Sequence, residues 1–577
     1  MPHNKLAPRT SAFLLFKSSK GLRLRKARTI EIQAKKITAM VAFSLLLALS
    51  IVLGNHIVIS GNPYSGLVTE NFIAPYSPSD FGIFIAAFAI AIACCLLLNF
   101  LFCKGINSTL KRGDDKPLKA RPVAIYAIIM FALQLPYLLT YYPGLIFNDS
   151  ISSISQALGL LPYYNHHPVV YTLLIQACID TAHALGFSTN TGCALYSIVQ
   201  MVVMCTTYSI MIQWIMQRTG VRGWCRVALV ILFGLTPYIA TYSIAMWKDS
   251  LFSAAIVLAT VLLFDFVKSR GSIARRSKSW IPLFALDCFI IAFLRSNGVL
   301  VDLGILLALT AISLFKRGKR SGHTTDWVAT AIPACALAAN LIITGPLYTA
   351  LGIAPSSKVE GYGIPLNQMA RVAALDGDMS ESDKEYMNEL LPLSEYEAVY
   401  SPTCTDPLKW DERFNSEPLE TDFFSHWASM LIKNPVVYFE SWELQTFGYW
   451  TLNHPAVLLH SSNISGGVPR TAADPMDAES LGIFPQNLLS ENAEALFPLD
   501  TPSVPLGWAA WGVAFLALVC ILQGRARYLI PLIPCLMLIA SLLVASPIWY
   551  WERYGAAMQF LILFFISMPF AMAKHEA

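Results

Sequence analysis

The sequence has 577 residues, of which 55% are hydrophobic and only 14% are charged. A soluble protein of this length would carry roughly 25% charged residues, so the composition excludes an ordinary soluble enzyme. The formal net charge of +4 is small, and the distribution of charge along the chain is more informative than its sum.

The N-terminal segment 1–36 is strongly basic. It holds ten Lys and Arg residues against a single acid, Glu31. A basic flank ahead of the first apolar run is typical of a segment retained in the cytoplasm, and this explanation is preferred to nucleic-acid binding. The sequence predicts a cytoplasmic tail at 1–36 and no nucleic-acid partner.

Long apolar runs follow, and about 20 apolar residues are needed to cross a bilayer core of about 30 Å. Such runs are stable in lipid as helices, because each backbone amide must find its partner within the segment. The sequence therefore predicts an all-α polytopic membrane protein with twelve transmembrane helices. These spans are predicted at 37–59, 82–103, 121–140, 191–216, 226–246, 249–267, 280–295, 298–315, 327–348, 506–523, 528–546 and 556–573.

Basic loops before the third span and after the fourth mark the cytoplasmic side. Residues 141–167 must then lie outside, and an odd number of crossings must separate them from the basic loop 217–226. The apolar stretch 168–186 and the run 191–216 therefore cannot both cross. We therefore predict that 151–162 and 168–186 form helices at the outer interface, or partly re-enter it. Twelve spans then place both termini in the cytoplasm.

The segment 349–505 has a different composition. It holds 23 acidic and 7 basic residues, a balance of −16, and parity places it outside. It is too long for a simple loop and large enough for a small folded domain. Residues 421–450 mix apolar and polar character, which predicts amphipathic helices docked on the membrane surface, whereas 461–503 is predicted to be irregular.

The predicted organisation has five parts. They are a basic tail at 1–36, two N-terminal transmembrane helices at 37–120, a transmembrane core at 121–348, an extracytoplasmic segment at 349–505 and three C-terminal transmembrane helices at 506–577. Most of the twelve cysteines fall in apolar spans, and no CxxC or Cys/His metal spacing occurs, so neither a disulfide framework nor a metal site is predicted.

The first external loop carries candidate chemistry. Asp149 comes directly after the third span, and His166 and His167 precede Pro168. A carboxylate here can take a proton from an acceptor hydroxyl or amine, and the histidines can hydrogen-bond an anionic leaving group. The structural alternative is that Asp149 caps the following helix and that the histidines occupy a solvated turn.

This loop resembles the first external loop of the GT-C glycosyltransferase superfamily, membrane enzymes that use polyprenyl-phosphate-linked sugars. The resemblance consists of an aspartate soon after a span, a short helix and a His-Pro turn opening a second helix. Protein O-mannosyltransferases and the aminoarabinose transferases of lipid A belong to that superfamily. The resemblance implies a GT-C-like core at 121–348, and it places the catalytic carboxylate at Asp149.

The chain more closely resembles an uncharacterised family of multi-pass proteins from Gram-positive bacteria, which is distantly related to that superfamily. The segments that carry this likeness extend from 143 to 554 and read PGLIFNDSISS, NHHPVVYTLL, WKDSLF, FLRSNG, GIPLNQMARV, KNPVVYFESWELQTFGYW and WERY. Ser150 stands where an Asp-Glu pair would be completed, and no clear DxD occurs. The sequence therefore leaves the need for a divalent cation and the identity of the donor open, and no metal ligands are assigned.

Three predicted external turns carry further candidates for substrate binding. Lys248 and Asp249 lie between the fifth and sixth spans, where they form either a mutually neutralising pair or a phosphate-binding lysine beside a second acid. Arg295 follows the seventh span, where its side chain either reaches the interface or clamps a lipid phosphate.

The last external turn holds Glu552, Arg553 and Tyr554, with Arg553 as a second candidate phosphate ligand. In the external segment, Gln368 and Arg371 share helical spacing and resemble a family motif, although a surface pair is equally compatible with the sequence.

These candidates predict a glycosyltransferase that moves a sugar from a polyprenyl-phosphate donor to a glycan, lipid or protein acceptor on the outer face of a bacterial plasma membrane. The alternative is a transporter or flippase of a lipid-linked saccharide, which requires polar residues at the membrane midplane. Asp265 and Asp287 are the acids closest to that description.

Overall fold

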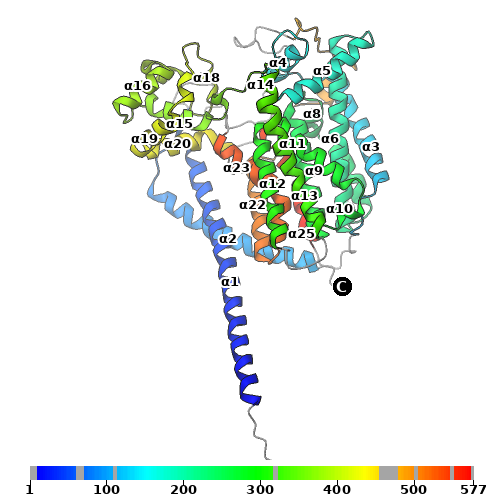
Figure 1. Ribbon diagram of the computed structural model, residues 1–577, viewed down its shortest axis with the longest axis vertical. Helices are drawn as coiled ribbons and strands as arrows, with labels where there is room; N and C mark the ends of the chain where they lie inside the picture. The colour runs from blue at the N-terminus through cyan, green and yellow to red at the C-terminus, as the bar shows by residue number, and fades with distance from the viewer. Residues whose placement is uncertain are drawn as a thin grey trace, which may run out of the picture.

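The computed structural model describes residues 10–59, 71–107, 114–315, 323–453, 478–499, 504–545 and 552–572. Figure 1 shows a bundle of long helices with a smaller helical unit beside its upper end. In the described residues the only sheet has two antiparallel strands, β1 (Ile57–Val58) and β2 (Phe72–Ile73). The fold is all-α, as predicted.

Two N-terminal helices lie along the side of the bundle. α1 (Thr10–His56) packs against α2 (Pro78–Asn107) and α22 (Leu506–Leu522), and the ring of Phe43 meets that of Trp511 edge-on at 5.5 Å. The lower part of α1 leaves the body of the protein in Figure 1. The basic segment predicted as a tail is therefore helical from Thr10 onward.

The main bundle surrounds α9 (Lys248–Lys268), whose apolar residues are almost all buried. Its neighbours include α6 (Thr189–Thr219), α11 (Trp280–Leu294) and the 3-10 helix η7 (Ala526–Leu532). The remaining elements of the bundle are α3 (Ala120–Thr140), α10 (Ile273–Arg276), α12 (Ser296–Phe315), α13 (His323–Ile342), η1 (Ile343–Leu347), α14 (Tyr348–Ala350), α23 (Ile533–Ala545), η8 (Glu552–Tyr554), α24 (Ala556–Phe560) and α25 (Ile562–Ala571).

Eight helices in the described residues are long and apolar enough to cross a membrane, and one bent helix pair can be counted as a ninth. Four further apolar helices are shorter: Val169–Ala184, Trp280–Leu294, Leu506–Leu522 and Ile562–Ala571. A membrane span must be long enough to cross the bilayer core and apolar over that length. Because several helices meet both requirements, the chain is an all-α polytopic membrane protein.

The stretch 226–246 was predicted as one span, and the structure divides it. α7 (Trp224–Leu235) and α8 (Pro237–Ile244) are separated by Thr236 and bent by 55°. Pro237 occupies the first turn of α8, where its missing amide hydrogen costs nothing. The residue before a proline is driven out of the helical region, and Thr236 is extended at φ −69° and ψ 117°.

Two short helices follow α3, as predicted, but the first has different bounds. α4 (Asn148–Ala157) begins and ends earlier than the predicted 151–162, and α5 (Val169–Ala184) matches 168–186 closely. α5 packs along the first part of α6. Both helices lie at the upper end of the bundle in Figure 1, so the third span is followed by helices that gather at one end.

A unit with its own core follows α14, and we call it the α15–α20 unit. Its elements are η2 (Lys358–Glu360), α15 (Gly363–Ala374), α16 (Glu381–Leu390), η3 (Leu393–Glu395), α17 (Tyr396–Val399), α18 (Asp406–Lys409), η4 (Glu417–Glu420), α19 (Phe423–Lys433) and α20 (Pro435–Thr446), followed by η5 (Phe447–Tyr449). Leu366, Met369, Met387, Tyr396 and Met430 are fully buried in its core. Two helices, α19 and α20, occupy the stretch 421–450 in which amphipathic helices were predicted, and α19 is the one that is clearly amphipathic.

The last part of the segment 349–505 does not belong to this unit. Residues 478–499, which include α21 (Ala493–Leu496), return to the bundle, where Gln486 forms a backbone bridge with Tyr142. The Leu488 amide donates to the Leu139 carbonyl at 2.8 Å, and the Phe497 ring packs on Tyr137. The single predicted segment thus consists of a separate unit and a return strap.

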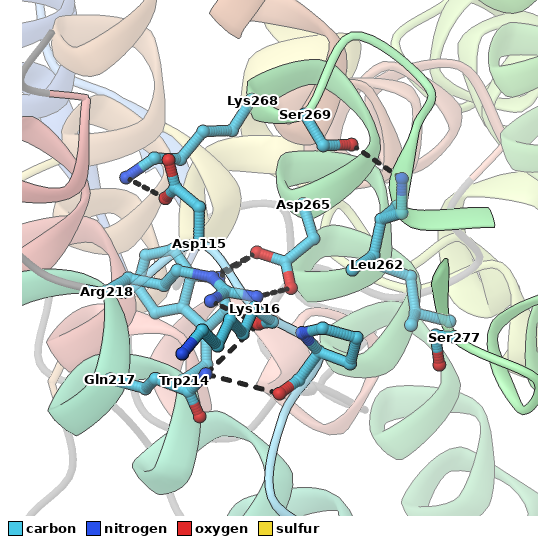
Figure 2. Close-up of polar contacts among 12 residues, drawn as sticks. Asp115, Lys116, Trp214, Gln217, Arg218, Leu262, Asp265, Lys268, Ser269 and Ser277 are labelled. Atoms are coloured by element: carbon cyan, nitrogen blue, oxygen red, sulfur yellow. Dashed lines mark hydrogen bonds and ion pairs between the residues drawn. The ribbon is translucent and has the colours of Figure 1, made fainter. Parts of the chain in front are cut away.

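The lower end of the bundle is closed by a polar network, shown in Figure 2. Arg218 at the end of α6 binds both oxygens of Asp265 and donates to the Lys116 carbonyl at 2.8 Å. Trp214 donates to the same carboxylate at 3.0 Å, and Lys268 pairs with Asp115 at 3.0 Å. Asp265 is therefore a structural ion-pair partner, which removes it from the acids proposed for a transport pathway.

Candidate functional site

A backbone junction at the upper end brings two distant segments together. Leu145 forms a parallel bridge with Ala245, its amide donates to the Ile244 carbonyl at 3.0 Å, and the Met246 amide donates to the Leu145 carbonyl at 2.9 Å. The junction lies just before the N-termini of α4 and α9, so it sets Asp149 beside Lys248.

Glycine makes this junction possible. Gly144 has φ 123°, a backbone conformation that side-chain-bearing residues rarely adopt. A Cβ at this position would lie 2.8 Å from the Ile244 carbonyl oxygen and closer still to the Ser197 hydroxyl. The absence of a side chain at 144 is therefore required for the two segments to approach.

Side chains from the neighbouring helices fix the other half of the junction. The Gln200 amide nitrogen donates to the carbonyls of Tyr242 and Ser243, both at 3.1 Å. The Met246 carbonyl accepts hydrogen bonds from Ser150 at 2.6 Å and from the Tyr171 hydroxyl. These buried backbone carbonyls at the C-terminal end of α8 therefore have hydrogen-bond partners. Through these hydrogen bonds, α4, α5 and α6 hold the end of α8 in place.

Asp149 is the meeting point of two cations. Its Oδ2 atom lies 3.2 Å from Lys248 Nζ and 3.1 Å from Arg553 Nη1. The Asp149 side chain is 23% exposed, whereas those of Lys248 and Arg553 are 14% and 8% exposed. The carboxylate therefore remains reachable while its partners are held largely within the protein.

A second carboxylate lies deeper. Asp249 pairs with Arg295, and its Oδ2 atom is 3.9 Å from Arg553 Nη1. The Asp249 side chain is only 1% exposed. Arg553 is therefore shared between two aspartates, and we call Asp149, Lys248, Asp249, Arg295 and Arg553 the charged cluster.

Aromatic faces position the guanidinium groups. The Arg553 guanidinium lies 5.0 Å from the ring centre of Trp247, and Trp247 stacks on Phe147 at 4.1 Å. The Arg295 guanidinium lies 4.2 Å from the ring centre of Tyr554. Cations over aromatic faces are attracted by the ring quadrupole, so both arginines are oriented as well as neutralised.

The two histidines connect the charged cluster with the α15–α20 unit. Lys248 Nζ donates to His167 Nδ1 at 2.8 Å, and the rings of His166 and His167 are 4.5 Å apart. His166 Nδ1 lies 3.6 Å from Glu360 Oε1, which also pairs with Lys409 at 2.9 Å. A chain of polar contacts therefore runs from Asp149 to η2 and α18.

The surroundings shift the protonation of these groups. Burial opposes ionisation of Asp149, but the charges of Arg553 and Lys248 outweigh it and hold the pKa of that carboxyl well below its usual range. Burial, reinforced by the Lys248 charge, lowers the pKa of His167 well below that of free histidine. A negative Asp149 and a neutral His167 are thus the resting forms at neutral pH.

Most of the predicted site residues come together here, namely Asp149, His166, His167, Lys248, Asp249, Arg295, Arg553 and Tyr554. Glu552 is buried nearby, where its carboxylate accepts from Gln559 at 3.3 Å. The predicted aspartate cap of α4 is replaced by Phe147 at the N-cap position, with Asp149 in the first turn.

Gln368 and Arg371 lie elsewhere, inside the α15–α20 unit. Gln368 binds the Tyr438 carbonyl at 3.1 Å and the Trp427 indole at 2.9 Å. Arg371 pairs with Glu440 at 2.8 Å. These contacts hold α15 against α19 and α20, and none of them reaches the charged cluster.

The structure adds Trp247, Glu360 and Lys409 to the residues around the site. Trp247 directly precedes Lys248, and its place in the WKDSLF segment was an available signal. Glu360 and Lys409 gave no such signal, because each is one charge among many in an acidic segment. Among the described residues, no group of three or more His, Cys, Asp or Glu side chains is arranged to hold a metal ion.

Comparison with known proteins places the chain in a family. Residues 162–475, more than half of the chain, match the family of unknown function DUF6020. The matched region includes both histidines, Lys248, Asp249 and Arg295, while Asp149 and Arg553 lie outside it. No curated protein matches the chain, and no solved structure matches it. The chain therefore belongs to the family of unknown function DUF6020.

Proposed function

We propose that this protein is a GT-C-type membrane glycosyltransferase, which moves a sugar from a polyprenyl-phosphate donor to an envelope acceptor at the charged cluster. The observation that supports this best is that a partly exposed carboxylate, Asp149, is surrounded by cations at one end of a membrane bundle. A lipid-linked phosphate can reach such a position laterally from the bilayer, and cations there stabilise a phosphate leaving group.

The charges suit an anionic ligand. Lys248, Arg295 and Arg553 outnumber the two aspartates with which they pair directly. Arg553 contacts both carboxylates through Nη1, and its planar guanidinium group suits the oxygens of a phosphate. In the proposed reaction these three cations bind the donor phosphate and carry its negative charge as it leaves.

Asp149 acts on the acceptor in this proposal. The acceptor hydroxyl oxygen attacks the anomeric carbon, the bond from that carbon to the phosphate oxygen breaks, and polyprenyl phosphate leaves with the electron pair. Asp149 receives the hydroxyl proton. When donor phosphate engages Lys248 and Arg553, their hold on Asp149 weakens and the pKa of that carboxyl rises towards its usual value, which makes it a better base.

The histidines have a positioning role. Neutral His167 accepts from Lys248 through Nδ1, which leaves Nε2 as its donor. This arrangement directs the ammonium group towards Asp149 and the incoming phosphate. His166, Glu360 and Lys409 link that pair to the α15–α20 unit, which in the proposal covers the site and selects the acceptor.

The proposal includes a topology. Twelve spans, counting the bent α7–α8 pair and three of the four shorter apolar helices, place both termini in the cytoplasm of a bacterial plasma membrane. The lower end, with Arg218, Lys268 and the Arg275–Arg276 turn of α10, carries the basic loops expected inside. The upper end, with the charged cluster, then faces outward. Cysteine labelling that located the α15–α20 unit in the cytosol would contradict this topology.

The test is sugar transfer by the purified protein in detergent, where no second compartment exists. A panel of undecaprenyl-phosphate hexoses and pentoses is mixed with a membrane glycan and glycolipid extract, and release of undecaprenyl phosphate is followed by mass spectrometry. Transfer by wild type, lost in Asp149→Asn and kept in Asp378→Asn, supports the proposal; Asp378 is a highly exposed acid of the α15–α20 unit. Equal transfer by wild type and Asp149→Asn removes this carboxylate from the mechanism.

A further inference from the structure

The underside of the α15–α20 unit carries an apolar stripe that nothing in the described residues covers. On α19 and α20 the side chains of Phe424, Ile432, Val436 and Phe439 are 54%, 80%, 67% and 47% exposed. Val436 and Phe439 are three residues apart and share one face of α20, and Ile432, in the last turn of α19, lies just across the turn at Asn434. Exposed apolar residues scattered singly need no explanation, but a contiguous stripe marks a contact surface.

The stripe continues into the membrane bundle. Phe439 stacks on Trp442 with ring centres 5.8 Å apart, and Trp442 stacks on Trp450 at 5.7 Å. The Trp442 indole donates to the Leu543 carbonyl at 2.9 Å, and Leu543 belongs to the last turn of α23. Trp442 is thereby fixed at the end of a helix that is long and apolar enough to cross a membrane.

A second span ends at the same level. Leu53, near the upper end of α1, and Ile57, in β1 directly after it, pack with Leu444 and Phe447 in one apolar cluster. Figure 1 shows α19 and α20 along the lower edge of the α15–α20 unit, beside the upper end of α1. Since α20 rises about 1.5 Å per residue, Phe439 and Val436 lie within about 9 Å of Trp442 along the helix. The stripe therefore lies at the depth where two spans leave the membrane.

The opposite side of the unit has a different chemistry. α16 exposes Glu381, Glu385 and Glu389, and Figure 1 places α16 at the far edge from α20. A unit that is acidic on one side and apolar on the other is oriented in the manner of interfacial helices, whose apolar face is buried about 5–10 Å into the boundary between headgroups and acyl chains. Tryptophans such as Trp442 and Trp450 are also typical of that boundary.

We infer that α19 and α20 lie on the bilayer surface, with Phe424, Ile432, Val436 and Phe439 inserted among the lipids, so that the α15–α20 unit is anchored to the membrane by lipid contacts in addition to its contacts with the spans. This anchorage does not depend on the proposed glycosyl transfer. It holds the unit, together with Glu360 and Lys409, at a fixed height above the charged cluster.

The test uses the full chain in lipid vesicles, with Cys94 and Cys335, which are exposed among the described cysteines, replaced by alanine. A bimane fluorophore is attached at Ile432→Cys or Phe439→Cys, and at Glu389→Cys on α16 as the matched control. Dibrominated phosphatidylcholine should quench the first two labels about twofold relative to the unbrominated lipid, as expected for insertion at the interface, and should leave the label at 389 unchanged. Equal quenching at all three positions, or none at 432 and 439, overturns the inference.

A second measurement separates the membrane from a protein partner. If another copy of the chain covers the stripe, Ile432→Cys should cross-link to Ile432→Cys of the other copy, and the label should stay unquenched by brominated lipid; this result also overturns the inference. Ile432 and Val436 are highly exposed, so substitution there is not expected to prevent folding.

Discussion

Arg553 and Asp149 are separated by 404 residues in the sequence, yet Arg553 Nη1 lies 3.1 Å from Asp149 Oδ2. One residue comes from the first turn of α4 and the other from η8. Burying the charge of an arginine such as Arg553 costs free energy, unless opposite charges balance it or it binds a ligand. This contact brings α4 and the C-terminal part of the sequence together at one site.

Replacing Arg553 should weaken the binding of a lipid phosphate. Arg553→Gln removes a guanidinium that contacts both aspartates, and we expect the affinity for undecaprenyl phosphate to fall at least about tenfold, or about 1.4 kcal/mol. Arg553→Lys should restore only part of it, because an ammonium lacks the planar fork. Native mass spectrometry in nanodiscs measures the bound fraction, and the half-exposed Arg413→Gln is the control. Unchanged affinity in Arg553→Gln would remove this residue from the site.

The junction at Gly144 should be intolerant of a side chain. Gly144→Ala introduces a Cβ that meets the Ser197 hydroxyl and the Ile244 carbonyl, so we expect a loss beyond the roughly 1–3 kcal/mol of a strained backbone. Gly159→Ala is the matched control, since its φ is also positive at 73° but nothing lies within 4 Å of the added Cβ. Thermal unfolding should show a clearly larger fall in Tm for Gly144→Ala. Similar falls in both variants would mean that the close approach is unimportant.

Stability should fall in mild acid because of His167. Its pKa is lower in the folded state than in the unfolded chain, so below about pH 6.5 the unfolded chain binds a proton that the folded protein does not. Stability then decreases by up to about 1.4 kcal/mol per pH unit as the pH falls below that value. The lowered pKa of Asp149 acts in the same direction but at lower pH: its contribution to stability is complete above about pH 4 and is lost as the pH falls below that value.

The measurement is the difference in Tm between pH 7.5 and pH 5.5. His167→Asn should show a smaller difference than wild type, whereas His183→Asn, at an exposed position, should behave as wild type. An identical pH dependence in wild type and His167→Asn would contradict the assignment of a neutral, buried His167.

Glu360 should couple the α15–α20 unit to the site. Glu360→Gln weakens the contacts with His166 and Lys409, so hydrogen exchange should become faster around the backbone bridge between Tyr164 and Ala354. Glu420→Gln, which loses an exposed ion pair with Lys358, should leave exchange there unchanged. Protection in Glu360→Gln equal to that of wild type would show that the backbone bridge alone carries the coupling.

The lower network should affect stability but not the site. Asp265→Asn leaves the buried Arg218 guanidinium without its charged partner, a change that typically costs about 3–5 kcal/mol. We expect a large fall in Tm with affinity for undecaprenyl phosphate retained, and little change for the exposed acid in Asp180→Asn. Loss of binding by folded Asp265→Asn would instead imply that the two ends are coupled.

Much of this arrangement could be predicted from the sequence, because membrane topology restricts where charges can go. Counting crossings placed Asp149, Lys248, Arg295 and Arg553 at the same end, and the structure brings them into contact. The same count predicts that α5 lies at the outer interface; the structure groups α5 with the other short apolar helices, so this assignment stays a prediction. Hydrophobicity and charge bias are properties of whole segments, so predictions based on them stay correct when a segment boundary is wrong by a few residues.

Other features depend on local backbone breaks and on contacts between helices, which hydrophobic periodicity does not predict. Pro237 was a signal for the helix break at Thr236. Because the apolar run continues on both sides of it, the sequence predicts one unbroken span. Gln368 and Arg371 were grouped with the site because they have helical spacing and resemble a family motif, and neither feature tells whether their helix face meets the bundle or a neighbouring helix. Here it meets α19 and α20, so their role in substrate binding stays a prediction.

The most direct test is an experimental structure of the wild-type protein in nanodiscs with undecaprenyl phosphate. We expect a phosphate within hydrogen-bond distance of Arg553 and of Lys248 or Arg295, with the lipid tail leaving sideways into the bilayer and Asp149 released from at least one cation. A phosphate bound elsewhere, with Asp149 still held by Lys248 and Arg553, would contradict the proposed function.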